Sequence, residues 1–227
     1  MGFTTVLFDL DHTLLDSDES ERLAFEETMR SVGVGEPSDH LATYQEINVG
    51  LWKQVEASEL SPNDVKWLRF ERLLAALEVD ADPIETSETY ASALGTHGQL
   101  YAGARELLEQ LGQRAALGLI TNGIGEVQRA RIERLQLNTH FSAIAISGEL
   151  GISKPDPAIF DVILADLGSP TASDAIIVGD SLTSDIAGGL NAGIATCWYN
   201  RSGGTSGNVN PTFEVTSLDQ IVPAIGL

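Results

Sequence analysis

Hydrophobic and polar residues follow two different patterns along this chain. Residues 4–10 form a short run of aliphatic, aromatic and β-branched residues that is typical of a buried strand, and the run ends abruptly at Asp11. Between residues 20 and 95, apolar positions recur at helical spacing and no strand-like run interrupts them. The pattern therefore predicts a first strand followed by a block of helices, over residues 21–32, 41–56, 62–77 and 83–94.

Beyond residue 101 the pattern alternates between helix-like and strand-like segments. It predicts helices over 104–111, 126–135, 157–167 and 185–192, strands over 116–120, 143–147, 175–178 and 196–199, and then a short strand near 213–215 with a terminal helix. Strands joined by crossover helices pair in parallel and are covered on both faces. We therefore expect an α/β fold: a doubly wound, mostly parallel, Rossmann-like core of residues 1–15 and 98–227, with a helical domain inserted at residues 16–97.

The charge balance narrows the function classes. The 227 residues include 13 Lys and Arg against 33 Asp and Glu, so the formal net charge is −20. Such a chain repels nucleic-acid polymers and anionic membrane surfaces, and no apolar run reaches the roughly 18 residues that cross a bilayer. The first residues lack the basic cluster of a signal peptide, and the lone Cys197 fits a reducing compartment as a small buried apolar side chain. We expect a cytoplasmic protein.

Chemically capable residues stand where the predicted strands end. Asp9 and Asp11 close the first strand, Thr121 and Asn122 the second, and Asp180 a later one, with Asp185 five residues on and Lys154 in a connecting segment. The carboxyl ends of parallel strands share one edge of the sheet, where ligands bind in open α/β folds. Carboxylates for a hard cation, donors for phosphate oxygens and a lysine for charge neutralisation are the groups that phosphoryl transfer needs.

Each of these signals is weak alone. Two acids after a strand are often turn or cap residues, and Asn122-Gly123 is a common turn pair. The functional interpretation depends on the four clusters occurring together and in order. In that order they resemble the haloacid dehalogenase-like phosphatases whose helical cap lies between the first two motifs.

The resemblance implies a role for each matching residue. Asp9 would be the nucleophile that forms an aspartyl-phosphate, and Asp11 the general acid and base. The family's Mg²⁺ would be held by the Asp9 carboxylate, the Asp11 backbone carbonyl and the Asp180 carboxylate, with Asp185 supporting it through its waters. The transferring phosphoryl group would be held by Thr121, Asn122 and Lys154.

Two residues refine this resemblance. The dehalogenase branch lacks the second aspartate of the first motif, so Asp11 favours a phosphatase. His12 stands where many members carry glycine, and it is expected to fill the loop by steric or hydrogen-bonding contacts rather than to catalyse. Magnesium also suits a site of few carboxylates, because it keeps several waters and takes substrate phosphate as a ligand.

The inserted helices bear on the substrate. The runs at 48–52, 69–71, 120–123 and 195–198 resemble the pyrimidine 5′-nucleotidase branch, which implies nucleoside 5′-monophosphates as substrates. Aromatic residues at helical spacing are usually core, but one could stack on a nucleobase. Three alternatives stay open: a phosphatase for phosphoglycolate or a sugar phosphate, a β-phosphoglucomutase-like phosphomutase, and a receiver-like signalling module. The last is disfavoured, since the nucleophile would follow the first strand and a receiver has no use for the helical insertion.

The expected partner is therefore a small-molecule phosphate ester, bound by a monomer or homodimer. Residues 16–98 hold 18 acidic and six basic residues, so most of the net charge belongs to the inserted helices. We expect that acidity on solvated faces, with the site itself attractive to phosphate.

Overall fold

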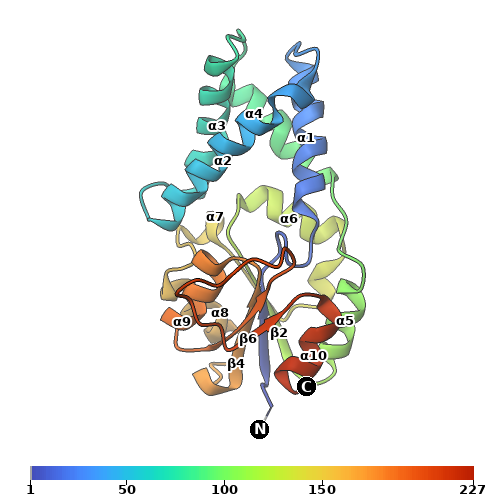
Figure 1. Cartoon of the computed structure of the whole chain (residues 1–227), viewed down its shortest axis with the longest axis vertical. Helices are drawn as coiled ribbons and strands as arrows, with labels where there is room; N and C mark the ends of the chain where they lie inside the picture. Colours follow the sequence, from blue (N-terminus) through green and yellow to red (C-terminus); the bar gives the residue numbers. More distant parts are fainter. Residues whose placement is uncertain (1) are drawn as a thin grey trace.

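A computed structural model describes residues 2–227, and it shows a six-stranded sheet with a helical region at one end. The strand order is β3-β2-β1-β4-β5-β6, and every neighbouring pair is parallel. The helical region comprises the four long helices between β1 and β2, and both chain ends lie at the opposite end of the molecule (Figure 1). The α/β fold class is thus confirmed. The strands are β1 (Thr5–Phe8), β2 (Ala116–Thr121), β3 (Ala143–Ile146), β4 (Ala175–Gly179), β5 (Ala195–Tyr199) and β6 (Phe213–Val215).

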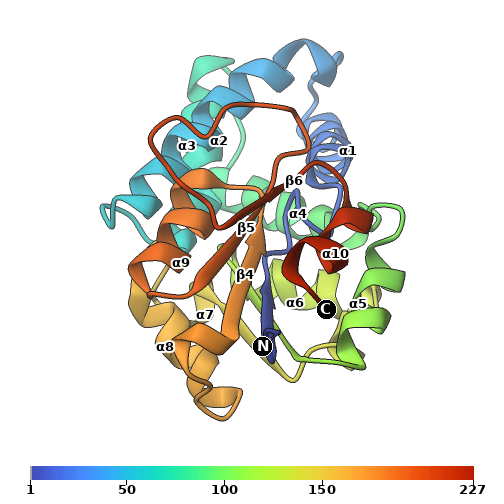
Figure 2. The ribbon, with the colours of Figure 1, turned by 60° about the horizontal axis from the view of Figure 1, so that its bottom comes forward.

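The first strand lies inside the sheet, between β2 and β4, and both of its faces are covered. Val6 and Phe8 pack on one face with α5 (Ala104–Gly112) and α10 (Ile221–Ile225). Leu7, one residue out of step, packs on the opposite face with α8 (Pro157–Asp166). All three side chains are fully buried, as the continuous apolar run predicts for a strand covered twice. Figure 2 shows α8 and α9 (Ala187–Asn191) on one side of the sheet and α5 and α10 on the other.

The helical region has its own apolar core. Its helices are α1 (Ser17–Ser31), α2 (Leu41–Glu56), α3 (Pro62–Ala76) and α4 (Pro83–Thr96). Tyr44, Phe70 and Tyr90 pack together within it, with ring centroids 5.1–6.0 Å apart, and the Tyr44 hydroxyl donates to the Tyr90 hydroxyl at 2.7 Å. Most of the aromatic side chains of these helices therefore serve as core, in keeping with their helical spacing.

Most elements fall within two residues of the predicted bounds, and the exceptions have local causes. The first helix begins at Ser17 rather than residue 21, because the Asp16 side chain accepts a hydrogen bond from the Glu19 amide and caps it. The segment Leu182–Ile186 forms a π-helical turn before α9, whereas the sequence predicts a helix that begins only at residue 185. The four-residue helix α7 (Ser147–Leu150) is not predicted at all.

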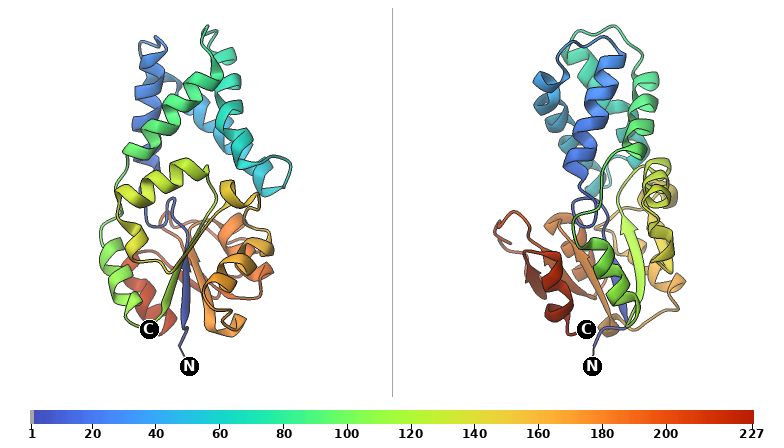
Figure 3. Two further views of the ribbon diagram at one scale, coloured as in Figure 1. Left: turned by 180° about the vertical axis from the view of Figure 1, so that it is seen from behind. Right: turned by 90° about the vertical axis from the view of Figure 1, so that its right-hand side faces the viewer.

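The helix α6 (Gly125–Arg134) connects the two parts of the molecule. It follows β2 at the carboxyl edge of the sheet and packs against α4 of the helical region (Figure 3). Short 3₁₀ turns complete the chain at Pro37–His40, Leu137–Thr139, Ala172–Asp174 and Leu218–Gln220. Within residues 2–227, no helix has the length and apolar character that a membrane crossing requires.

Candidate functional site

The carboxyl ends of β1, β2 and β4 open into a cavity of about 790 Å³. Its floor comes from the residues that follow these strands, and its other walls come from α1 to α4 and α6. Asp9, Asp11, Asn122, Lys154, Asp180 and Asp185, all singled out from the sequence, line it together. The parallel topology gathers them, because each lies just beyond a strand end or in a segment that returns to that edge.

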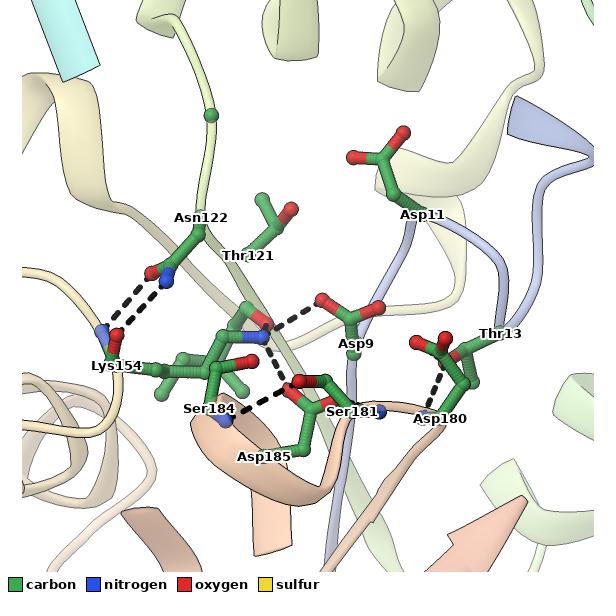
Figure 4. Close-up of polar contacts among 12 residues, drawn as sticks. Asp9, Asp11, Thr13, Thr121, Asn122, Lys154, Asp180, Ser181, Ser184 and Asp185 are labelled. Carbon is green, nitrogen blue, oxygen red and sulfur yellow. Dashed lines mark hydrogen bonds and ion pairs between the residues drawn. The ribbon is translucent and has the colours of Figure 1, made fainter. Parts of the chain in front are cut away.

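Lys154 lies at the centre of a buried charge cluster. Its Nζ donates to Asp9 Oδ1 at 2.7 Å, to Asp185 Oδ1 at 2.6 Å and to the Ile120 carbonyl at 2.8 Å (Figure 4). Burial alone would lower the pKa of this ammonium, but the two carboxylates outweigh it and hold the pKa above its ordinary value. Lys154 therefore stays charged and orients both acids.

Three carboxylates converge beside this lysine. Oxygen atoms of Asp9, Asp180 and Asp185 lie within 4.8 Å of one another. Burial raises the pKa of Asp9 well above its usual range against the opposing charge of Lys154, and burial together with Asp185 raises the pKa of Asp180 to about 7. One ammonium does not neutralise three acids, so a hard divalent cation with oxygen ligands fits this group. Asp185, expected to act through water, is close enough to be a direct ligand.

The Asp11 carboxylate points away from the lysine cluster (Figure 4). It accepts hydrogen bonds from Ser17 Oγ at 2.6 Å, Gln128 Nε2 at 2.6 Å and Arg131 Nη1 at 2.9 Å. Burial raises its pKa, but Arg131, Ser17 and the other donors outweigh burial, so the pKa of Asp11 is lowered. In this arrangement Asp11 is an ionised group bonded to α1 and α6.

Thr121 and Asn122 already have protein partners. The buried Thr121 hydroxyl accepts from Gln128 Nε2 at 2.8 Å. Asn122 donates from Nδ2 to the Lys154 carbonyl and accepts at Oδ1 from the Lys154 amide, both at 2.9 Å. Asn122 therefore fixes the backbone from which Lys154 reaches the acids, and of the two only Asn122 lines the cavity.

Several residues that complete the site were not predicted. Thr13 Oγ1 accepts from the Asp180 amide at 3.1 Å, and Trp198 Nε1 donates to the Asp180 carbonyl at 2.8 Å. A Cβ on Gly179 would overlap the Asp185 carboxylate, so only glycine leaves room for it. In the sequence, the glycine directly before Asp180 is the feature that indicates a close approach to the backbone at this point.

His12 and the helical region complete the cavity wall. His12 has φ of 62°, a left-handed conformation that explains why glycine is common at this position in the family that the chain resembles.

Three acidic residues of the helical region, Asp18, Glu21 and Glu56, line the cavity, and the other 15 of its acids do not. Among the cations of that region, Lys53 and Arg69 line it.

Comparisons with known proteins agree with this geometry. Residues 6–199 match the family described as haloacid dehalogenase-like hydrolase. The chain is 34% identical to the pyrimidine 5′-nucleotidase PynA of Streptococcus pneumoniae, covering 99% of this chain and 96% of that protein. It is 32% identical to the pyrimidine 5′-nucleotidase YjjG of Escherichia coli, with 97% of each covered. A magnesium-bound crystal structure of the putative hydrolase YfnB from Bacillus subtilis superposes with a TM-score of 0.91, at 31% identity and full coverage of both chains.

Proposed function

This chain belongs to the haloacid dehalogenase-like hydrolase family, and we propose that it is a magnesium-dependent phosphatase of nucleoside 5′-monophosphates, with pyrimidine nucleotides preferred. One observation carries the proposal: the Asp9, Lys154, Asp180 and Asp185 cluster at the floor of a cavity. A nucleophilic carboxylate, a buried ammonium and a cation site there suit transfer of a phosphoryl group. The net charge of −20 supports a small ester rather than a nucleic-acid polymer.

In this mechanism Asp9 attacks phosphorus and becomes an aspartyl-phosphate, while the ester P–O bond breaks and the leaving oxygen, protonated by Asp11, departs as an alcohol. Lys154, 2.7 Å from Asp9, holds that carboxylate in place and offsets the negative charge of the incoming phosphoryl oxygens. Asp9, Asp180 and Asp185, with the Asp11 backbone carbonyl that the family resemblance adds, would hold Mg²⁺. When bound, the ion supplies charge neutralisation at the phosphoryl oxygens.

Asp11 is the proposed acid and base. It would protonate the leaving oxygen in the first step and take a proton from the hydrolytic water in the second. The Arg131 contact of 2.9 Å favours the ionised carboxylate, so Asp11 must separate from Arg131 before it can carry a proton to the leaving group. Thr121, Asn122 and Lys154 are the proposed phosphoryl-binding residues, and of these Asn122 and Lys154 line the cavity.

The choice of nucleotides rests on relatives and on the cavity. Two relatives, at 34% and 32% identity, are pyrimidine 5′-nucleotidases, and each matches essentially the whole chain. The cavity of about 790 Å³ lies within the size range of small-molecule sites and is walled in part by the aromatic side chains of Trp52 and Tyr90. The helical region, which we assign to a separate cap domain of residues 16–97, would cover the leaving group.

The test is phosphate release from a substrate panel by the purified chain. UMP, dUMP and CMP are compared with phosphoglycolate, ribose 5-phosphate and glucose 1-phosphate, each with Mg²⁺ and with EDTA. We expect kcat/KM for the pyrimidine nucleotides to exceed the others at least tenfold, and EDTA to abolish turnover. Highest kcat/KM on phosphoglycolate or a sugar phosphate would replace the nucleotide assignment with that alternative.

The variant Asp9→Asn tests the mechanism. An amide cannot form the acyl phosphate, so kcat should fall by about 1,000-fold or more while the fold is kept. Near-normal hydrolysis by Asp9→Asn would contradict the mechanism. Turnover that requires a sugar bisphosphate would instead indicate a phosphomutase, and a long-lived Asp9-phosphate would indicate a receiver-like role.

A further inference from the structure

Arg69 is a buried guanidinium with unused donors in the wall of the same cavity. It projects from α3, is 2% exposed and lines the cavity. Among residues 2–227, its Nε and Nη2 are buried without a hydrogen-bond partner, and no carboxylate lies within ion-pair distance of the guanidinium. Its remaining nitrogen, Nη1, makes only two long contacts of 3.4 Å, to Tyr44 Oη and Asn48 Oδ1.

Such a side chain is costly to the fold and calls for a reason. An arginine cannot shed its proton, so a buried guanidinium without an ion pair or a full set of acceptors destabilises the folded chain. Its contacts with the Tyr90 ring at 4.5 Å and the Phe70 ring at 5.5 Å compensate only in part. A buried polar group left unsatisfied in a native fold needs an explanation, and a ligand that completes its hydrogen bonds is one.

The surroundings of Arg69 define what kind of ligand fits. Asn48 accepts from Arg69 at Oδ1 and donates from Nδ2 to Glu21 Oε2 at 2.9 Å, so a carboxylate lies one amide away from the guanidinium. Glu21 lines the cavity as well. With Asp18 and Glu56 on the same wall, the acids of the helical region outnumber Lys53 and Arg69. An anionic ligand group is disfavoured there, and a neutral acceptor is favoured.

We infer that Arg69 is the specificity-determining residue for the leaving group, and that its guanidinium turns into the cavity when substrate binds, so that Nε and Nη2 donate to a carbonyl oxygen of a pyrimidine base. The inference rests on the proposed nucleotide phosphatase activity and adds the recognition step to it. The buried Tyr90 ring supports the guanidinium, and the partly exposed Trp52 provides a flat apolar wall of the cavity on which a base can stack. The Asn48–Glu21 pair keeps the subsite close to neutral, which selects the base edge over a carboxylate.

The experiment compares Arg69→Met with the matched control Arg72→Met, one turn further along α3 on its exposed face. Both variants and the wild type are assayed with UMP, ribose 5-phosphate, phosphoglycolate and p-nitrophenyl phosphate. For Arg69→Met we expect kcat/KM on UMP to fall about 10- to 100-fold, as the loss of a charge-assisted hydrogen bond to substrate predicts. The other three substrates, which lack the base, should change less than about threefold, and Arg72→Met should match the wild type throughout.

Each other outcome has a definite meaning. If wild-type protein does not hydrolyse UMP, the proposed function fails, and the inference about Arg69, which rests on it, is overturned with it. If wild-type protein does hydrolyse UMP, but Arg69→Met lowers kcat/KM equally on all four substrates, Arg69 is structural and the inference is wrong. A loss confined to phosphoglycolate would identify a carboxylate as the occupant and overturn it too. Thermal unfolding separates these cases, since Arg69→Met should keep the wild-type Tm within about 3 °C once the unpaired charge is gone.

Discussion

The Asp11 carboxylate combines a proposed chemical role with a structural one. Its bonds to Ser17 and Arg131 join the loop after β1 to α1 and to α6. Because burial is outweighed by these partners, the folded protein holds the pKa of Asp11 below its ordinary value. Ionised Asp11 therefore stabilises the fold wherever the unfolded chain would also be ionised, which is above about pH 4.

We expect Asp11→Asn to lower the free energy of unfolding by about 1–3 kcal/mol at pH 7, because hydrogen bonds to a charged group are lost. The deficit should be the same at pH 5 and should shrink below pH 4, where protonation removes the same interaction from the wild type. Urea unfolding followed by circular dichroism at pH 7, 5 and 3.5 measures it. Asp18→Asn, at an exposed carboxylate, is the control and should change stability by less than about 0.5 kcal/mol. A deficit that grows towards acid pH would show that the sign is wrong.

Cys197 illustrates a residue whose behaviour follows from position alone. It lies in β5, is fully buried, and burial raises the pKa of its thiol to about 12. The thiolate is the reactive form, so native protein at pH 8 should react with Ellman's reagent at least about 100 times more slowly than protein in guanidinium chloride. Stopped-flow absorbance measures both rates. Comparable rates would mean that β5 opens readily or that the thiol is accessible.

At the scale of elements, the junction between β4 and its π-helical turn shapes the cation site. Asp185 lies in that turn and accepts from the Ser181 amide at 2.9 Å, which folds its carboxylate back over Gly179. The carboxylate occupies the space where a Cβ at Gly179 would stand. The turn therefore works only with glycine as the last residue of β4.

Gly179→Ala should displace Asp185 from Lys154 and the cation site. We expect kcat/KM to fall about 100-fold, since a misplacement near 1 Å has that cost, with a loss of about 1–3 kcal/mol in stability from overpacking. Gly112→Ala at the end of α5 is the matched control: its Cβ would meet Leu117 at an ordinary 3.8 Å, so activity should be unchanged. Phosphate release and urea unfolding measure both variants. Full activity in Gly179→Ala would show that Asp185 is dispensable.

The elements also show what sequence patterns can and cannot supply. The bounds of α2 match the prediction, and the starts of α3 and α4 were marked by a capping residue followed by proline. The start of α1 was missed, since its first turn is wholly polar and carries no apolar period. The charged residues at the sheet edge were predictable because strand ends converge there. The partners on α6 and the unpaired Arg69 were not, because they depend on how two groups of helices pack across the cavity.

At the scale of the whole molecule, two chain crossings connect the helical region to the sheet, and they run side by side. The Asp16 amide donates to the Gln99 carbonyl at 2.9 Å, and the Tyr101 amide donates to the Leu14 carbonyl at 2.8 Å. Two arginines of α6 hold the returning crossing. Arg131 Nε donates to the Leu94 carbonyl at 3.1 Å. The residue that binds Asp11 therefore also binds the C-terminal end of α4. The position of the helical region and the state of Asp11 are thereby linked.

Arg134 supplies the larger share of this attachment. It donates from Nε to the Gly95 carbonyl at 3.0 Å and from Nη2 to the His97 and Gly98 carbonyls, both at 2.7 Å. Removing a partly buried side chain leaves these carbonyls to water, so Arg134→Ala should lower the free energy of unfolding by about 1–3 kcal/mol. It should also raise amide hydrogen exchange in residues 95–99 while exchange in β1 and β4 stays as in the wild type.

Mass-spectrometric hydrogen exchange distinguishes a loosened crossing from a weakened fold. Arg129→Ala is the control on the same helix, because among residues 2–227 the hydrogen bonds and ion pairs of the Arg129 side chain go to the surface carboxylate of Glu149 and not to the crossing. If Arg134 holds the hinge of the helical region, faster exchange appears in Arg134→Ala alone and is confined to the crossing. Equal acceleration in the strands would mean that the arginine stabilises the molecule globally, and no acceleration would mean that the crossing is held by its backbone pairing with residues 14–16.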